Sequence, residues 1–231
     1  MQADLEVMRR YQVFLNYPYD SDYLPFAEAL SFGVVAAGMV PITALDLTDP
    51  DAPRLEMIVE AITSCHYSAH DLSRCRGEGP GNFARMNMPM EMGMAMFHAL
   101  SAQRSDHRCA FFVPSGYSYH EYASDLSGLD PLRYEENPAA LLAIVYEWLR
   151  RIGPEGIVSK QPTVEVIEAF VEFSNRRDEI DGAGPDRMPS HVEVREVMYQ
   201  VCDQHGWWDF RATKMGKARF PEVPLRLRAK S

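Results

Sequence analysis

Segments rich in strand-forming residues alternate with helical segments through the first 150 residues of the chain. The strand-like segments are YQVFLNY (11–17), MVPITALD (39–46), CHYSAHDLS (65–73, ending as a strand near Asp71) and RCAFFVP (108–114). β-branched and aromatic residues favour extended backbone, and the first segment ends before Pro18. Because strands that alternate with helices pair in parallel, the chain is predicted to form an α/β fold, a parallel sheet with helices on both faces.

Proline and glycine mark the ends of these elements. Pro25 begins a helix that runs to about Ala37, and Gly38 follows it, as expected of helix ends. Pro41 places the second strand at a sheet edge or at a strand start. A helix that begins near Pro53 is predicted to bury one apolar face, whose members are spaced i, i+3, i+4 and i+7: Leu55, Ile58, Val59 and Ile62.

Beyond residue 150 the pattern is helical only. A helix that begins with the Asn137–Pro138 cap leads into this part, where one helix covers about 164–177 and a capping box from Ser190 to Glu193 predicts another. The segment DEIDGAGPDRMP (178–189) is the best linker candidate. We therefore predict an α/β domain over residues 1–150 and a helical extension over 151–231, which ends in a basic tail.

Composition limits the class of protein. Hydrophobic residues make up 46% of the 231 residues and charged residues 24%, close to the averages for globular proteins. No apolar run approaches the roughly 18 residues of a membrane span, and the N-terminal residues lack an apolar signal core. We expect a cytoplasmic protein without membrane association.

Four cysteines are scattered without a CxxC pair or a metal-ligand spacing: Cys65, Cys75, Cys109 and Cys202. A chain of this size does not need disulfide bonds for stability. We expect them to be buried thiols, and we predict no metal site.

The formal charge of −10 argues against nucleic-acid binding by the body of the protein. Residues 211–231 differ, because seven bases there face one acid, Glu222: Arg211, Lys214, Lys217, Arg219, Arg226, Arg228 and Lys230. This tail either docks onto an acidic partner subunit or a polyanion, or is a solvated chain terminus.

Ligands of open parallel sheets bind at the carboxyl ends of the strands. Polar and aromatic residues follow the first three strands: Asn16, Tyr17, Tyr19 and Asp20 after the first, Asp46 after the second, and His70, Asp71 and Ser73 at the end of the third. Of these, Asn16, Tyr17, Tyr19, Asp20, Asp71 and Ser73 are the candidates for substrate binding.

The stretch NMPMEMGMAM (87–96) carries one charge, Glu91. Asn87 and Glu91 are four residues apart and share one helix face, with Asn87 expected as the N-cap and Glu91 expected to be ionised near the positive end of the helix dipole. A carboxylate beside an aromatic cleft can stabilise or trap the sugar cation that forms when an N-glycosidic bond breaks. The alternative is structural, because acids are common in the first turns of helices and methionine stripes are common in cores.

Other chemistries lack their patterns. His66 and His70 would lie about 13 Å apart on a strand, with no third ligand spaced for zinc. The chain has no GxSxG nucleophile elbow and no GxGxxG or GxxxxGK[ST] phosphate loop. We predict no bound cofactor.

Three motifs in order resemble those of known families. VFLNYPYDSDYLPFAEAL resembles the opening strand and helix of TIR-type domains, and RLEMIVEAITSCHYSAHDLS resembles their next helix and strand. NMPMEMGMAM is similar to the N-x-x-x-E-x-G signature shared by bacterial TIR-like proteins and the nucleoside 2-deoxyribosyltransferase superfamily. The likeness covers about residues 11–150, and it implies a flavodoxin-like, TIR-like fold.

The resemblance also implies a function. It assigns the catalytic role to Glu91 with Asn87 as its neighbour, and a nucleotide pocket formed by the tyrosines Tyr17 and Tyr19 with Asp71. The implied reaction is hydrolysis of a nucleotide N-glycosidic bond, with NAD⁺ as the leading substrate rather than a cofactor. By analogy it implies an antiviral defence effector gated by a signal or by assembly, as a homo-oligomer or with a partner subunit through the C-terminal region. Two alternatives stay open: a non-catalytic nucleotide-sensing or scaffold module, and a nucleoside deoxyribosyltransferase.

Overall fold

The structure is a computed structural model, and most of the chain is described in it. The described residues are 10–47, 49–75, 86–101, 106–119, 124, 129–154, 160–181 and 189–207. The basic tail and the glycine-rich segment 76–85 lie outside them, so the prediction for the tail stays a prediction.

One all-parallel sheet forms the centre of the described residues. Its strands stand in the order β2-β1-β3-β4-β5, with the bounds Gln12–Asn16 (β1), Val40–Thr43 (β2), Tyr67–Asp71 (β3), Arg108–Pro114 (β4) and Leu132–Tyr134 (β5). This order is that of flavodoxin-like folds, in which the chain reverses direction across the sheet between β1 and β3. The predicted α/β fold is therefore confirmed, and Pro41 lies in the edge strand β2 as expected.

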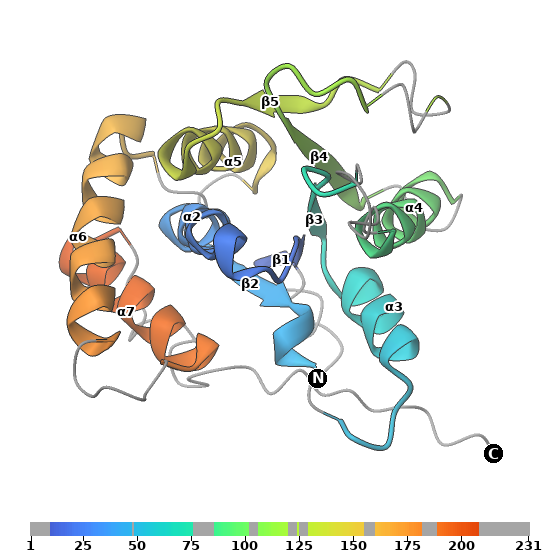
Figure 1. The fold of residues 1–231 in the computed structure, drawn as a ribbon, viewed down its shortest axis with the longest axis horizontal. Helices are drawn as coiled ribbons and strands as arrows, with labels where there is room; N and C mark the ends of the chain where they lie inside the picture. Colours follow the sequence, from blue (N-terminus) through green and yellow to red (C-terminus); the bar gives the residue numbers. More distant parts are fainter. Residues whose placement is uncertain are drawn as a thin grey trace.

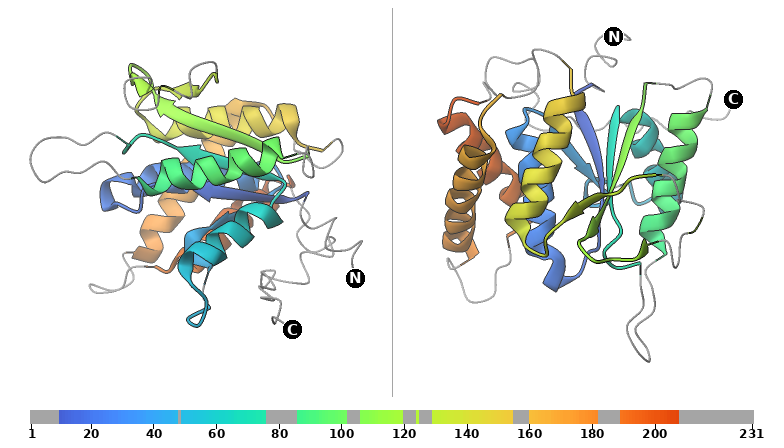
Figure 2. Two further views of the ribbon diagram at one scale, coloured as in Figure 1. Left: turned by 90° about the vertical axis from the view of Figure 1, so that its right-hand side faces the viewer. Right: turned by 90° about the horizontal axis from the view of Figure 1, so that it is seen from above.

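Helices cover both faces of the sheet. Their bounds are Leu24–Ala36 (α2), Arg54–Ser64 (α3), Asn87–Leu100 (α4), Pro138–Ile152 (α5), Thr163–Asp181 (α6) and His191–Gln204 (α7), with short 3₁₀ turns at Ser21–Tyr23 (η1) and Ala44–Asp46 (η2). Helices α2 and α5 pack side by side on one face, and α3 and α4 cover the other (Figure 1). Helices α6 and α7 form a further layer outside α2 and α5 (Figure 2).

The local signals at helix ends act as the sequence predicts. Gly38 has a positive φ of 80° and ends α2 by donating its N–H to the Val35 carbonyl, while the Met39 N–H reaches Val34. This pattern is a Schellman motif. Asn137 caps α5 through its side chain, and the Ser190 capping box begins α7.

Helix α2 is buried over nearly its whole circumference. Residues 29–36, ALSFGVVA, are buried without exception, because α2 lies between the sheet and the outer helices. On the outer side, Phe32 packs its ring against Phe170 and Phe173 of α6, with centroids 5.5 and 5.4 Å away. The hydrophobic core of the α/β layers thus continues without a break into the C-terminal helices.

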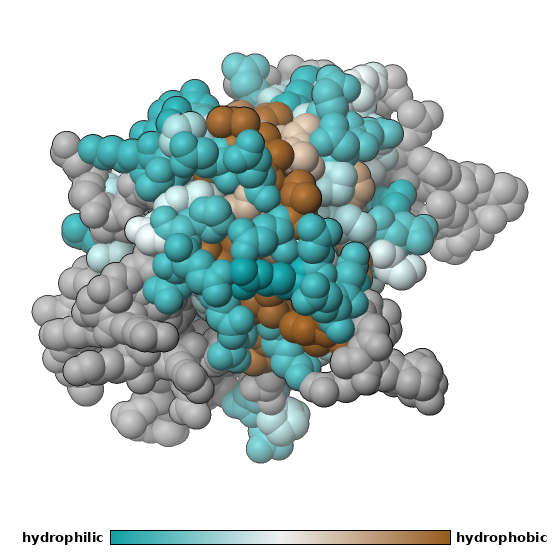
Figure 3. Space-filling model, turned by 90° about the vertical axis from the view of Figure 1, so that its left-hand side faces the viewer, coloured by the Kyte–Doolittle hydropathy of each residue, from teal (hydrophilic) through white to brown (hydrophobic). Residues whose placement is uncertain are grey.

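The outer face of the molecule over α6 and α7 is mostly hydrophilic, with narrow hydrophobic strips between polar side chains (Figure 3). Both helices are therefore amphipathic and turn their apolar sides inward. In the described parts of the chain, no helix is both long enough and apolar enough to cross a membrane.

Three expectations about local structure need correction. The second strand ends at Thr43, because Ala44–Asp46 form a 3₁₀ turn that the Thr43 side chain caps. The buried face of α3 is rotated from the predicted one: Leu55 and Val59 are about half exposed, while Met57 and Ala61 are buried beside Ile58 and Ile62.

The third correction concerns elements that the sequence did not mark correctly. Strand β5 was not predicted, since three residues are too short to show periodicity. Helix α6 continues to Asp181, so the first four residues of the predicted linker are helical.

The prediction of buried thiols is confirmed for Cys65, Cys75 and Cys202, and Cys109 is partly buried.

Candidate active site

A cavity of about 240 Å³ lies at the carboxyl edge of the sheet, beside the neighbouring strands β1 and β3. This is the point where the strand order reverses, which is the usual ligand site of open parallel sheets. The residues that line it come from the end of β1, the start of α3 and the start of α4: Asn16, Tyr17, Pro18, Tyr19, Arg54, Leu55, Ile58, Asn87, Met88, Met90 and Glu91. Five of the eight predicted site residues are among them.

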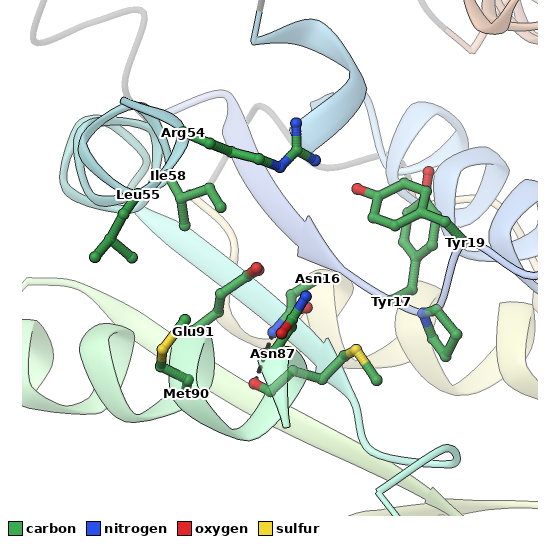
Figure 4. A pocket seen from close by; sticks show the side chains of 11 residues that line it. Asn16, Tyr17, Tyr19, Arg54, Leu55, Ile58, Asn87, Met90 and Glu91 are labelled. Atoms are coloured by element: carbon green, nitrogen blue, oxygen red, sulfur yellow. Dashed lines mark hydrogen bonds between the residues drawn. The ribbon is translucent and has the colours of Figure 1, made fainter. Parts of the chain in front are cut away.

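Glu91 projects into this cavity from the second turn of α4 (Figure 4). The residue is only 7% exposed, and no described residue donates a hydrogen bond to its carboxylate. Buried carboxylates normally have hydrogen-bond partners, so one without a partner that faces a cavity marks a candidate functional group.

The electrostatic state of Glu91 differs from the sequence expectation. Burial raises the pKa of the Glu91 carboxyl from 4.5 to about 7, and the positive charge of Arg54 offsets only part of this rise. The expected preference for the ionised form was therefore wrong, because the loss of water outweighs the helix dipole at the fifth residue of the helix. At neutral pH the group can both hold and release a proton.

Asn87 does not cap the helix. The N-cap is Met86, whose backbone is already near-helical and whose side chain makes no capping hydrogen bond, so α4 begins with Asn87 as its first residue. The Asn87 side chain is exposed and lies beside Asn16 at the cavity wall, one helical turn from Glu91 (Figure 4). Its amide is therefore available to a ligand, although not for the reason that the sequence suggested.

Asn16 links strands β1 and β3 to the start of α4 beneath the cavity. Register pairing puts Asn16 next to His70 on β3, and the Asn16 Nδ2 group donates to His70 Nδ1 (3.0 Å) and to the Met88 carbonyl (2.8 Å). Since both Nδ2 hydrogens are used, His70 Nδ1 accepts, and the imidazole is neutral with its proton on Nε2. Burial lowers the pKa of His70 to about 3, which keeps it neutral. Asn16 thus fixes the start of α4, and with it Glu91, to two strands.

The two tyrosines after β1 have different environments. Tyr17 is 6% exposed, and its ring stacks on Tyr23 at 6.1 Å. Tyr19 is 44% exposed, and its hydroxyl accepts a hydrogen bond from the Ala44 N–H (3.1 Å). The rings of Tyr17 and Tyr19 are 5.0 Å apart. Tyr19 is therefore the ring with an accessible surface, and Tyr17 supports it from behind.

Arg54 was missed by the sequence analysis. It is the first residue of α3, it is exposed, and its guanidinium points into the cavity from the side opposite Glu91 (Figure 4). Apart from Asn87 and Glu91, the site residues predicted from the sequence all lie at or just after the ends of strands. The start of the helix after β2 also lies at the carboxyl edge of the sheet, and a lone cation after Pro53 was the available signal.

Asp71, Ser73 and Asp20 do not join the cavity lining. Asp71 is fully buried, where its carboxylate accepts hydrogen bonds from the Tyr134 hydroxyl (2.7 Å) and the Ser73 N–H (2.8 Å). Burial raises the pKa of Asp71. Asp20 instead lies 3.7 Å from the Arg74 guanidinium. The structure therefore brings none of these three together with Glu91.

Asp46 binds helix α7 and does not line the cavity. Its carboxylate accepts two hydrogen bonds of 2.9 Å from Arg195 of α7 and another of 2.7 Å from the Thr43 N–H. Burial would raise the pKa of Asp46, but the contacts with His191 and Arg195 outweigh it and hold the pKa well below its usual range. This partly buried ion pair connects the turn after β2 to α7.

No protein-family model matches the chain, and no curated protein matches its sequence significantly. The assignment of function therefore depends on the chain's own residues and their geometry.

Proposed function

We propose that the protein hydrolyses the N-glycosidic bond of a nucleotide, with NAD⁺ as the leading substrate. The observation that carries the proposal is Glu91, a buried carboxylate that faces a cavity at the switch point of the sheet and has no hydrogen-bond partner among the described residues. The resemblance of NMPMEMGMAM to the signature of TIR-like and deoxyribosyltransferase-like proteins supports the same role.

The reaction requires stabilisation of positive charge at the anomeric carbon. When the bond from C1′ to the nicotinamide nitrogen breaks, the electron pair leaves with nicotinamide, which becomes neutral, and the sugar becomes a cation. An ionised Glu91 beside C1′ stabilises this cation. A water molecule then attacks C1′ and loses a proton, which Glu91 in the cavity wall can accept because its pKa is about 7. The products are nicotinamide, ADP-ribose and one proton.

Asn87 and Tyr19, which line the same cavity as Glu91, can orient the substrate. The Asn87 amide, one turn before Glu91, can hydrogen-bond the ribose hydroxyls. The half-exposed ring of Tyr19 offers a stacking surface for a base. The cavity volume of about 240 Å³ is below the roughly 300–1,000 Å³ of pockets for drug-sized ligands, so it fits the reacting half of a dinucleotide better than the whole.

The proposal predicts a specific pH dependence. Only the ionised carboxylate stabilises the cation, and the pKa of Glu91 is about 7. Activity should therefore rise as the pH increases from 6 to 8 and level off above it. A profile that is flat from pH 5 to 9 would contradict the assignment of Glu91.

The test is an assay of free base. Purified wild type, Glu91→Gln and the surface control Glu168→Gln, a change on the exposed side of α6, are incubated with NAD⁺ and a panel of nucleotides and deoxynucleosides. We expect release of nicotinamide by wild type and by the control, and a loss of at least about a hundredfold in Glu91→Gln. Equal turnover by Glu91→Gln would refute the mechanism.

The same assay separates the alternatives. Exchange of one labelled base for another would indicate transfer of a sugar rather than hydrolysis. Recovery of an intact, bound nucleotide after long incubation would indicate a binding module.

We also propose, by analogy with the families that the chain resembles, that activity is gated by assembly in a cytoplasmic defence effector. Specific activity that does not change with protein concentration would count against this gating.

A further inference from the structure

Two opposite charges face the candidate cavity without neutralising each other. Arg54 and Glu91 lie on opposite walls, and the guanidinium and the carboxylate both point into the space between them (Figure 4). Burial raises the pKa of both Glu91 and Tyr19, and the positive charge of Arg54 offsets a part of each rise, so its field reaches both side chains.

Arg54 and Glu91 are not a salt bridge. A close ion pair would hold the pKa of Glu91 below its ordinary value, whereas burial raises it to about 7 in spite of Arg54. Within the described residues, Arg54 has neither an ion-pair partner nor a hydrogen-bond acceptor. Its five N–H donors are thus available to a ligand.

The backbone at Arg54 adds to the positive charge. Arg54 and Leu55 are the first two residues of α3, and Pro53 at the N-cap makes no side-chain capping bond. The Pro53 carbonyl accepts the N–H groups of Glu56 and Met57, and the N–H groups of Arg54 and Leu55 have no acceptor among the described residues. A helix N-terminus with free N–H groups favours anions.

The two charges together define a substrate. Glu91 is suited to a cationic sugar or ring, and the wall formed by Arg54 and the start of α3 is suited to an anion. We propose that Arg54 binds a phosphate of the nucleotide whose glycosidic bond lies at Glu91, so that the enzyme selects phosphorylated nucleotides over nucleosides. This inference rests on the proposed site, and it names the substrate class of that site.

The test is a binding experiment that does not depend on turnover. In a Glu91→Gln background, titration calorimetry measures the affinities of NAD⁺, nicotinamide mononucleotide and nicotinamide riboside, which share the same cationic ring and ribose but differ in phosphate. Adding Arg54→Gln should weaken binding of both phosphorylated ligands by roughly 10- to 100-fold and change binding of the riboside by less than about twofold. Arg54→Lys should fall between, because it keeps the charge but loses the forked geometry.

A matched control is Arg74→Gln, which removes an arginine that pairs with Asp20 away from the cavity. It should leave all three affinities unchanged. Equal losses for the riboside and the phosphorylated ligands, no loss for any of them, or no binding of any ligand would overturn the inference. Phosphate-dependent binding through Arg54 in a protein that releases no base would support the inference and refute the proposed hydrolysis.

Discussion

Replacing Glu91 with glutamine should make the folded protein more stable at the pH where it works. Glutamine has nearly the shape of a protonated glutamate but cannot ionise. Glu91 is 7% exposed, and its pKa is raised from 4.5 to about 7 by burial. Ionisation of this group therefore costs the folded state more than the unfolded state, and the Gln variant avoids that cost.

The size and sign of the effect follow from the pKa. Between about pH 4.5 and 7 the folded protein binds more protons at this residue than the unfolded chain, so the free energy of unfolding falls as the pH rises through this window. At about 1.4 kcal/mol per pKa unit, the full penalty is about 3 kcal/mol. The penalty reaches nearly its full size above pH 7, and it is below about 1 kcal/mol at pH 5.

Urea denaturation of wild type and Glu91→Gln at pH 5 and pH 8 measures this difference, with Glu168→Gln as the control on the surface of α6. We expect Glu91→Gln to exceed wild type by about 3 kcal/mol at pH 8, which corresponds to a melting temperature about 6 to 12 °C higher. A gain that does not grow from pH 5 to pH 8 would refute the argument, because it would show that Glu91 ionises as easily in the folded protein as in the unfolded chain.

Two further predictions concern the residues that position the site. Arg195→Met leaves the partly buried Asp46 carboxylate without its guanidinium and should cost about 1.5 to 3 kcal/mol at pH 7 in urea denaturation. Since the pair lowers the pKa of Asp46, the advantage of wild type should shrink once the pH falls below about 4, and a constant difference would count against the pair. Asn16→Leu leaves His70 Nδ1 unpaired and removes the hydrogen bond that Asn16 adds to the helical Met88 carbonyl, so it should cost about 1 to 3 kcal/mol, with a matching loss of turnover below the melting temperature. Full stability in this variant would show that Asn16 does not hold α4 in place.

The candidate site was only partly readable from the sequence. The residues after β1 were found because the carboxyl edge of a parallel sheet follows from the order of elements. Asn87 and Glu91 were found from their spacing of four residues and from the single charge in the stretch 87–96. Asp71 was also chosen by the rule of the sheet edge, but it points into the core, where the Tyr134 hydroxyl binds it. Tyr134 belongs to β5, a strand too short to predict, so no pattern near Asp71 could reveal its partner.

The sequence by itself determined the alternation of the first four strands with helices and several helix ends, because signals such as Gly38, Asn137 and the Ser190 capping box act on their immediate neighbours. Only the tertiary structure decided the chemical state of the site. The pKa of Glu91 depends on how much water the surrounding helices remove and on the distant charge of Arg54. Both are set by elements far apart along the chain, and local sequence carries no measure of their distance in space.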